Sequence, residues 1–125
     1  MKRILALCIP HKHQRYDTVG DYFDCHGATC FSISDMDNEW YERLVFLHEF
    51  VEETLCRKRG IQNADIDAFD VAFEAARLPD NEEEPGHQLD APYHREHVFA
   101  EKLERLMAEE LGIDWDTYDK TVTGL

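Results

Sequence analysis

Short apolar runs separated by polar residues and glycine occupy the N-terminal part of the chain. The apolar run at residues 4–9 ends at Pro10, and this pattern predicts a buried strand. Two more strands are expected at residues 21–24 and 28–34, because they flank His26-Gly27, a dipeptide that suits a tight hairpin turn. The pattern therefore predicts a small antiparallel sheet.

From residue 35 onward the apolar positions recur with helical spacing. Asp35 or Asp37 is the expected cap of a long helix that runs to about Arg59, where Gly60 stops it. Further helices are expected at residues 65–78, 92–111 and 115–122, with an acidic, solvated and mobile loop at residues 80–86. The predicted fold class is α+β, with a small N-terminal antiparallel sheet followed by three to four packed helices.

Length and charge limit the domain organisation and the class of partner. The chain has 125 residues, so a single domain is expected, with a strand-rich part at 1–34 and a helical part at 35–125. The net charge of -14 repels phosphate backbones, which argues against a nucleic-acid partner. No segment reaches the roughly 18 to 20 apolar residues that span a bilayer, and the apolar start is too short for a signal peptide. A cytoplasmic protein without a membrane partner is therefore expected.

The long helix at about residues 35–59 carries the first candidate chemistry. At about 100° per residue, its strongest apolar stripe consists of Trp40, Leu44, Leu47, Val51 and Leu55. His48 borders this stripe and Glu52 follows one turn later, whereas Glu42, Glu49 and Glu53 are expected to face solvent. A carboxylate among apolar neighbours is costly unless it is neutralised or coordinated, and His and Glu at i, i+4 can bind one cation. An ion pair that only orders the core explains the same pattern.

The helix expected at residues 92–111 repeats this pattern. Glu96 lies within its apolar face, and His97 and Glu104 follow the edge of that face, with His94 one turn earlier. Small Ala100 leaves room beside His97 for an ion or a ligand. A surface salt-bridge stripe would not explain Glu96 and His97. Because metal sites in helical bundles are built from facing histidines and carboxylates, the two helices together predict a divalent metal site for Zn, Mn or Fe.

A shared ion imposes a geometry that a structure can test. If His48 and His97 bind one ion, their ring nitrogens should lie roughly 3 to 3.5 Å apart, because Zn–N bonds are about 2.0 to 2.1 Å long. Each ring should also donate its other N–H to a carboxylate or carbonyl, with Glu96 or Glu104 as the candidate. A separation above about 7 Å would exclude a shared ion.

Several stretches that cover most of the chain form a recognisable pattern. They are residues 16–22, 47–52, 55–56, 60–61, 67–70, 84–86, 91–93 with 97, and 112–115. In these stretches the chain resembles a family of small bacterial and phage (prophage-type) proteins with a His-Glu-x-x-Glu helix motif, found here at residues 48–52. No activity is established for that family, so the resemblance implies a shared architecture and a shared site but no reaction.

Two more distant resemblances concern single motifs. Residues 48–52 resemble the His-Glu-x-x-His helix of zinc peptidases with Glu52 in place of the second histidine, which would leave Glu49 as a general base. The i, i+3 carboxylate pairs, among them Asp67 and Asp70, are similar to the Mg²⁺ pairs of all-helical nucleotide pyrophosphohydrolases. No basic residue stands near these pairs to meet a triphosphate, however, and capping of a helix is the favoured role of the two aspartates.

Metal binding is the function that these residues predict, and a metal-dependent hydrolase is the favoured reaction class. The candidate metal ligands are His48, Glu52, His97, Glu104, His94 and Glu96. Glu49 is the candidate catalytic base. The substrate is left open between a small molecule and a protein, and a homo-oligomer is compatible with the sequence. Two alternatives remain: a non-enzymatic phage accessory or inhibitor protein that meets a basic partner through the acidic residues 82–84, and a buried polar network that binds nothing.

Overall fold

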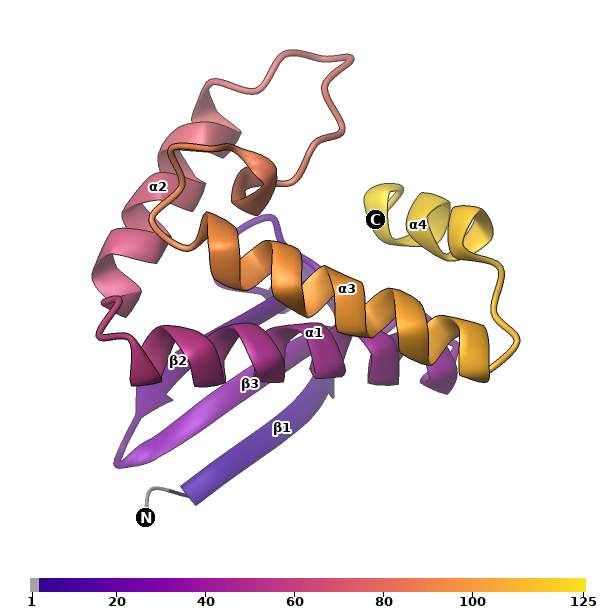
Figure 1. The fold of residues 1–125 in the computed structure, drawn as a ribbon, viewed down its shortest axis with the longest axis horizontal. Coiled ribbons are helices and arrows are strands. Elements are labelled where there is room, and N and C mark those ends of the chain that lie inside the picture. Colours follow the sequence, from indigo (N-terminus) through magenta and orange to yellow (C-terminus); the bar gives the residue numbers. More distant parts are fainter. Residues whose placement is uncertain (1–2) are drawn as a thin grey trace.

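A computed structural model, which describes residues 3–125, places a three-stranded sheet before four α-helices (Figure 1). The elements are β1 (Arg3–Ile9), the 3-10 turn η1 (His11–His13), β2 (Gly20–Cys25), β3 (Ala28–Ser34), α1 (Glu39–Lys58), α2 (Asn63–Ala75), the 3-10 turn η2 (Pro85–His87), α3 (His94–Glu110) and α4 (Trp115–Thr123). The expected α+β class is therefore confirmed.

The sheet is mixed, which corrects the expectation of an antiparallel one. Its strand order is β1-β3-β2, and only the β2–β3 hairpin is antiparallel. The hairpin turn is the expected one, because His26 and Gly27 have φ values of 49° and 77°, the positive pair that tight two-residue turns require. After β1 the chain forms β2 at the opposite edge of the sheet. Strand β3 then lies between β1 and β2 and pairs with β1 in parallel.

Strand β1 is exposed, so the prediction of a buried strand is wrong. Leu5 and Leu7 are 51% and 66% exposed. The strand lies at the edge of the sheet, and its apolar side chains are left uncovered by the elements described here, whereas α1 packs against β2 and β3.

Helix α1 is covered on two sides, by the sheet and by α3, which runs beside it in the opposite direction (Figure 1). Asn38, rather than Asp35 or Asp37, caps it by accepting hydrogen bonds from the backbone N–H groups of Trp40 and Tyr41. The predicted apolar stripe is displaced, because Trp40 is 51% exposed. The buried residues of α1 are Leu44, Val45, His48, Glu52, Glu53 and Cys56.

The other helices begin or end within a few residues of their expected bounds. Helix α2 ends at Ala75, three residues before the expected Leu78, and α3 begins at His94 rather than near Pro92. Asp114 caps α4 as expected. None of the helices described between residues 3 and 125 is long and apolar enough to cross a membrane.

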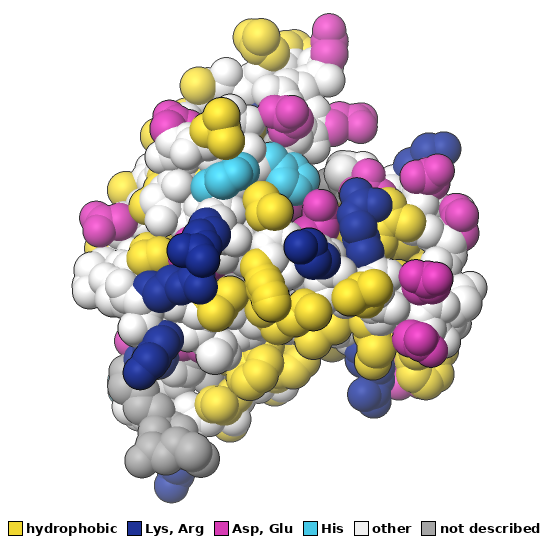
Figure 2. All heavy atoms as spheres, viewed as in Figure 1, with side chains coloured by type: hydrophobic (Ala, Val, Ile, Leu, Met, Phe, Trp, Pro, Cys, Tyr) yellow, Lys and Arg dark blue, Asp and Glu magenta, His cyan; other side chains and the backbone are white. Residues whose placement is uncertain are grey.

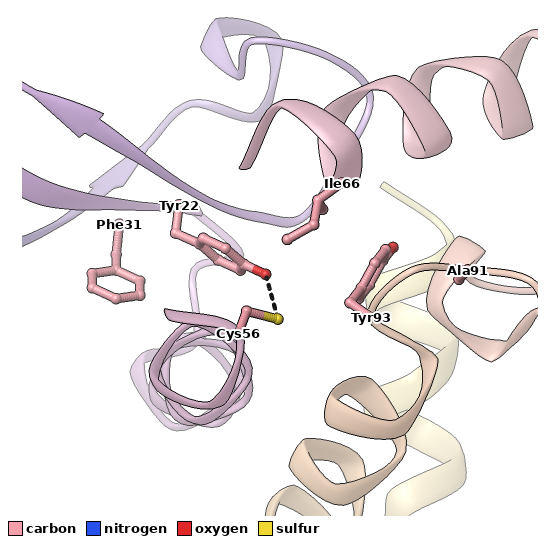
Figure 3. Close-up of a cluster of buried hydrophobic side chains, with 6 residues drawn as sticks. All are labelled: Tyr22, Phe31, Cys56, Ile66, Ala91 and Tyr93. Atoms are coloured by element: carbon pink, nitrogen blue, oxygen red, sulfur yellow. Dashed lines mark hydrogen bonds between the residues drawn. The ribbon is translucent and has the colours of Figure 1, made fainter. Parts of the chain in front are cut away.

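Two apolar clusters form the core. The first consists of Tyr22, Phe31, Cys56, Ile66, Ala91 and Tyr93, contributed by the sheet, α1, α2 and the segment that leads into α3 (Figure 3). The second consists of Ile33, Leu44, Val45, Ala108 and Tyr118, from β3, α1, α3 and α4. Along α1 the buried His48 and Glu52 lie between the residues of these two clusters, so the fold holds a polar group inside an apolar core.

Candidate metal centre

Helices α1 and α3 bring two histidines together in the core. His48 of α1 and His97 of α3 are 7% and 4% exposed. Nε2 of His48 lies 3.1 Å from Nδ1 of His97. This separation meets the geometry that a shared ion requires.

Glu52 completes a triangle of ligand atoms. It follows His48 by one helical turn and is 4% exposed. Its Oε2 lies 3.2 Å from Nε2 of His48 and 2.8 Å from Nδ1 of His97. Ligand atoms around a tetrahedral zinc ion are about 3.4 Å apart, so a small outward shift would place one ion within bonding distance of all three atoms.

A carboxylate behind His48 sets which ring nitrogen faces the triangle. Oε1 of Glu104 lies 2.7 Å from Nδ1 of His48, and Tyr118 donates its hydroxyl to Oε2 of Glu104 at 2.5 Å. A histidine that donates Nδ1–H to a carboxylate keeps the lone pair of Nε2 for a metal ion. The structure therefore pairs Glu104 with His48, one of the two partners expected, and places Glu104 outside the triangle itself.

The charges of the triangle are strongly coupled. Burial alone would raise the pKa of Glu52, but its contacts with His48 and His97 hold that pKa at about 2. Burial alone would lower the pKa of His97, but the carboxylates of Glu52 and Glu84 raise it to about 10. Tyr22 adds a hydroxyl that donates to Oε1 of Glu52 at 2.7 Å. The site thus holds buried negative charge that either protons or a cation can neutralise.

Glu49 lines a cavity beside the triangle, so the expectation that it faces solvent is wrong. A Cβ at Gly20 would lie 2.7 Å from Cγ of Glu49, which shows how closely the start of β2 packs against this side chain. Within residues 3–125 its carboxylate accepts no hydrogen bond, and burial and the charge of Glu52 raise its pKa well above the usual value. Glu53 was also expected in solvent and is buried, where its carboxylate accepts a 2.6 Å hydrogen bond from Arg57.

The cavity has a volume of about 380 Å³ and reaches from the triangle toward α2 and residues 79–86. Its carboxylate-bearing lining residues are Asp17, Asp21, Glu49, Glu52, Asp67, Asp70, Glu74, Glu82, Glu83, Glu84 and Glu104. Arg77 also lines it, but its guanidinium is bound to Glu74 and to the carbonyl oxygens of Asn81 and Glu83. Glu74 is paired with Arg77, and Asp21 and Asp67 with Arg15, and the remaining carboxylates form an acidic wall of the cavity.

Two candidate ligands lie away from the triangle. In the first turn of α3, the carboxylate of Glu96 accepts a 2.6 Å hydrogen bond from Arg59. This guanidinium neutralises the charge of Glu96 away from the triangle. Nδ1 of His94 lies 2.9 Å from the carbonyl oxygen of Gly86 and holds that loop to α3. Helical spacing put both residues near His97, but the direction of each side chain depends on partners from other segments.

Sequence reasoning missed Glu84, which was expected in a solvated loop. Its Oε2 lies 2.8 Å from Nε2 of His97, although the ring N–H does not point at that oxygen. Burial alone would raise the pKa of Glu84, but the contact with His97 holds it at about 2. The sequence feature that could have indicated this is the Pro85-Gly86 dipeptide after three glutamates, because such a dipeptide favours a turn that can bring the chain back toward the core.

The paired aspartates of α2 do not cap it, which corrects the favoured reading. Gln62 stands at the N-cap, and Asp67 forms an ion pair with Arg15 at 3.2 Å. Asp70 is buried and accepts hydrogen bonds from the hydroxyls of Tyr16 and Tyr93. Neither carboxylate joins the triangle.

The buried Asp70 leads to a prediction about pH and stability. Burial outweighs the hydroxyl contacts and raises the pKa of Asp70 to about 6. The folded protein therefore favours the protonated carboxyl, and this contribution is complete below about pH 4 and is lost as the pH rises through 6. Relative to wild type, the free energy of unfolding of Asp70→Asn should rise by up to about 3 kcal/mol between pH 4 and 7.5.

Urea unfolding at several pH values measures this difference. Asp65→Asn, a change at an exposed position of the same helix, is the matched control and should run parallel to wild type. Parallel curves for wild type and Asp70→Asn would contradict the prediction.

The fold and the site define an α+β protein with a buried cluster of two histidines and one glutamate that could hold a metal ion. Comparisons with protein-family models, with curated proteins and with solved structures found no match for this chain. The argument for a function therefore rests on the site.

Proposed function

We propose that the protein binds a divalent metal ion through Nε2 of His48, Oε2 of Glu52 and Nδ1 of His97 and uses it in a hydrolytic reaction. The observation that carries the proposal is the triangle of these three atoms, with sides of 2.8 to 3.2 Å. Three protein ligands with an open position are typical of catalytic rather than structural zinc sites, and the same donor set suits Fe²⁺ and Mn²⁺.

A bound ion of this kind lowers the pKa of its water to about 7 and so makes hydroxide available near neutral pH. The cavity beside the triangle provides space for water and substrate, and Glu49 lines it next to the ligand His48. Glu49 would be the group that takes up the proton this water loses, because the charge of a bound ion would lower the raised pKa of its carboxyl, and it would then pass the proton to the leaving group.

The acidic wall of the cavity narrows the substrate class. A polyanionic substrate such as a nucleoside triphosphate would face many carboxylates, and Arg77, the guanidinium that lines the cavity, is already bound to Glu74 and two carbonyl oxygens. A volume of about 380 Å³ falls in the range of small-molecule sites. The proposed substrate is a small neutral or cationic ester or amide.

The alternative of an accessory protein with an acidic docking loop has less support. Of the three glutamates at residues 82–84, Glu84 turns toward His97 instead of presenting its charge to a partner.

Metal titration of the purified protein tests the proposal. After treatment with a chelator, Zn²⁺, Mn²⁺ or Fe²⁺ should raise the melting temperature by several degrees, because an ion at a hundred times its Kd stabilises the folded state by about 2.7 kcal/mol. Mg²⁺ prefers oxygen ligands and is the matched control ion, with little expected effect. Substoichiometric metal by elemental analysis, together with an unchanged melting temperature for every ion, would contradict the proposal.

A further inference from the structure

A second group of ligand atoms lies on the far side of the His97 ring. Glu84, His87 and His97 each offer one ligand atom, and these three atoms lie within 4.8 Å of one another. The rings of His87 and His97 meet edge to face, with centroids 4.8 Å apart. Glu84 and His87 are partly exposed, whereas all three residues of the first triangle are buried, so this group is closer to solvent. Figure 2 shows histidine side chains at the surface over η2 and the start of α3.

The environment of Nε2 of His97 indicates that this group binds a ligand. The residue is 4% exposed, and Nε2 is buried without a hydrogen-bond partner among residues 3–125, although Oε2 of Glu84 lies 2.8 Å away. Nε2 thus has the charge of Glu84 beside it but no aligned hydrogen bond, an arrangement that costs free energy in a buried group and is uncommon in natural structures. A metal ion between Nε2 and the Glu84 carboxylate would satisfy both.

The loop that carries the other two ligand residues is held tightly against the ring. A Cβ at Gly86 would lie 2.3 Å from Cγ of His97, so only glycine lets the backbone pass this close. Oε1 of Glu101 lies 3.1 Å from Nε2 of His87, which makes Nε2 the protonated nitrogen of that ring and leaves Nδ1 for an ion.

We propose that the protein holds a second divalent ion between Glu84, His87 and Nε2 of His97, so that the His97 ring bridges two ions. The inference rests on the proposed first site, which uses Nδ1 of the same ring. Both nitrogens of a bridging ring are deprotonated, so the second ion displaces the proton of Nε2 into solvent. Zn²⁺ and Cu²⁺ are among the ions that suit two imidazoles and one carboxylate.

The second site requires only a small rearrangement of side chains. The three ligand atoms lie within 4.8 Å of one another, and Oε2 of Glu84 already lies 2.8 Å from Nε2 of His97, compared with roughly 3.4 Å between ligands of a tetrahedral ion. Glu84 and His87 are partly exposed, so their side chains can adjust while the buried Gly86 between them stays against His97.

Zinc stoichiometry tests the second site. Wild-type protein dialysed against micromolar Zn²⁺ should retain two ions per chain, and His87→Gln and Glu84→Gln should each retain one. The exposed His13→Gln is the matched control for adventitious binding and should retain two. Thermal melts show whether each variant is folded. Two variants are used so that the test still stands if one of them fails to fold.

Other numbers of retained Zn²⁺ ions would contradict the second site, the proposed function or the choice of ligands. A wild type that retains one ion overturns the second site and leaves the proposed function standing. A wild type that retains none overturns both. Two ions in wild type and in both variants overturn the assignment to Glu84 and His87.

Copper tests the bridge itself. Two Cu²⁺ ions joined by one imidazolate couple their spins, so the EPR intensity of the doubly loaded wild type should fall well below that of two isolated ions. Singly loaded His87→Gln should give the full signal of one. An intensity equal to two isolated ions in the wild type would overturn the bridging role of His97.

Discussion

His48→Ala should lose affinity for Zn²⁺ by a factor of roughly 70 to 900 while the protein remains folded. A zinc site with four ligands is worth about 10 to 16 kcal/mol, so each ligand contributes about 2.5 to 4 kcal/mol. The substitution removes Nε2 from the triangle and leaves Glu52 and His97 as an incomplete site. Competition with a chelating dye measures the change.

Glu104→Gln provides a graded comparison for this prediction. It retains every atom of the triangle and weakens the contact that orients the His48 ring, together with the hydrogen bond from Tyr118 to the same carboxylate. Loss of such a supporting carboxylate costs about 10- to 100-fold in metal affinity, so this variant should fall between wild type and His48→Ala. The exposed His13→Gln should match wild type.

A buried polar network that binds nothing makes the opposite prediction. In that case the wild type has no metal to lose, and the loss of His48 removes one buried partner each from Glu52 and Glu104. The free energy of unfolding should then fall by about 3 to 5 kcal/mol in metal-free buffer. That result, together with a wild type that binds no Zn²⁺, would overturn the metal centre.

The meeting of His48, Glu52 and His97 could be predicted because it depends on local geometry. Residues at i, i+4 share a helix face, and two helices that each carry polar groups among apolar ones must bury them against each other. The separation of 3.1 Å between the two ring nitrogens follows from that facing arrangement.

The parts that were mispredicted depend on contacts between distant segments. Glu49 and Glu53 were expected in solvent because one covered face was assumed, whereas α1 is covered by both the sheet and α3. Strand β1 was expected inside because its residues are apolar, but the strand order that leaves it at the edge is decided by where the β2–β3 hairpin returns. The inward turn of Glu84 depends on its contact with His97.

Glu49→Gln should lower the rate of metal-dependent hydrolysis by roughly 10² to 10⁴, the usual contribution of a general base, and leave Zn²⁺ occupancy at the wild-type level. The substitution keeps the shape of the side chain against Gly20, so the packing of β2 on α1 is preserved, but an amide cannot take a proton from water.

Hydrolysis of small neutral and cationic chromogenic esters and amides by zinc-loaded protein measures the effect of Glu49→Gln, with elemental analysis of each sample. Glu39→Gln is the matched control, because this glutamate lies in the exposed first turn of the same helix and should retain the wild-type rate. If Glu49→Gln binds zinc and hydrolyses a substrate as fast as wild type, Glu49 is not the base. If Glu49→Gln instead loses both the activity and the ion, Glu49 supports metal binding rather than proton transfer, and its proposed role is wrong in that case too.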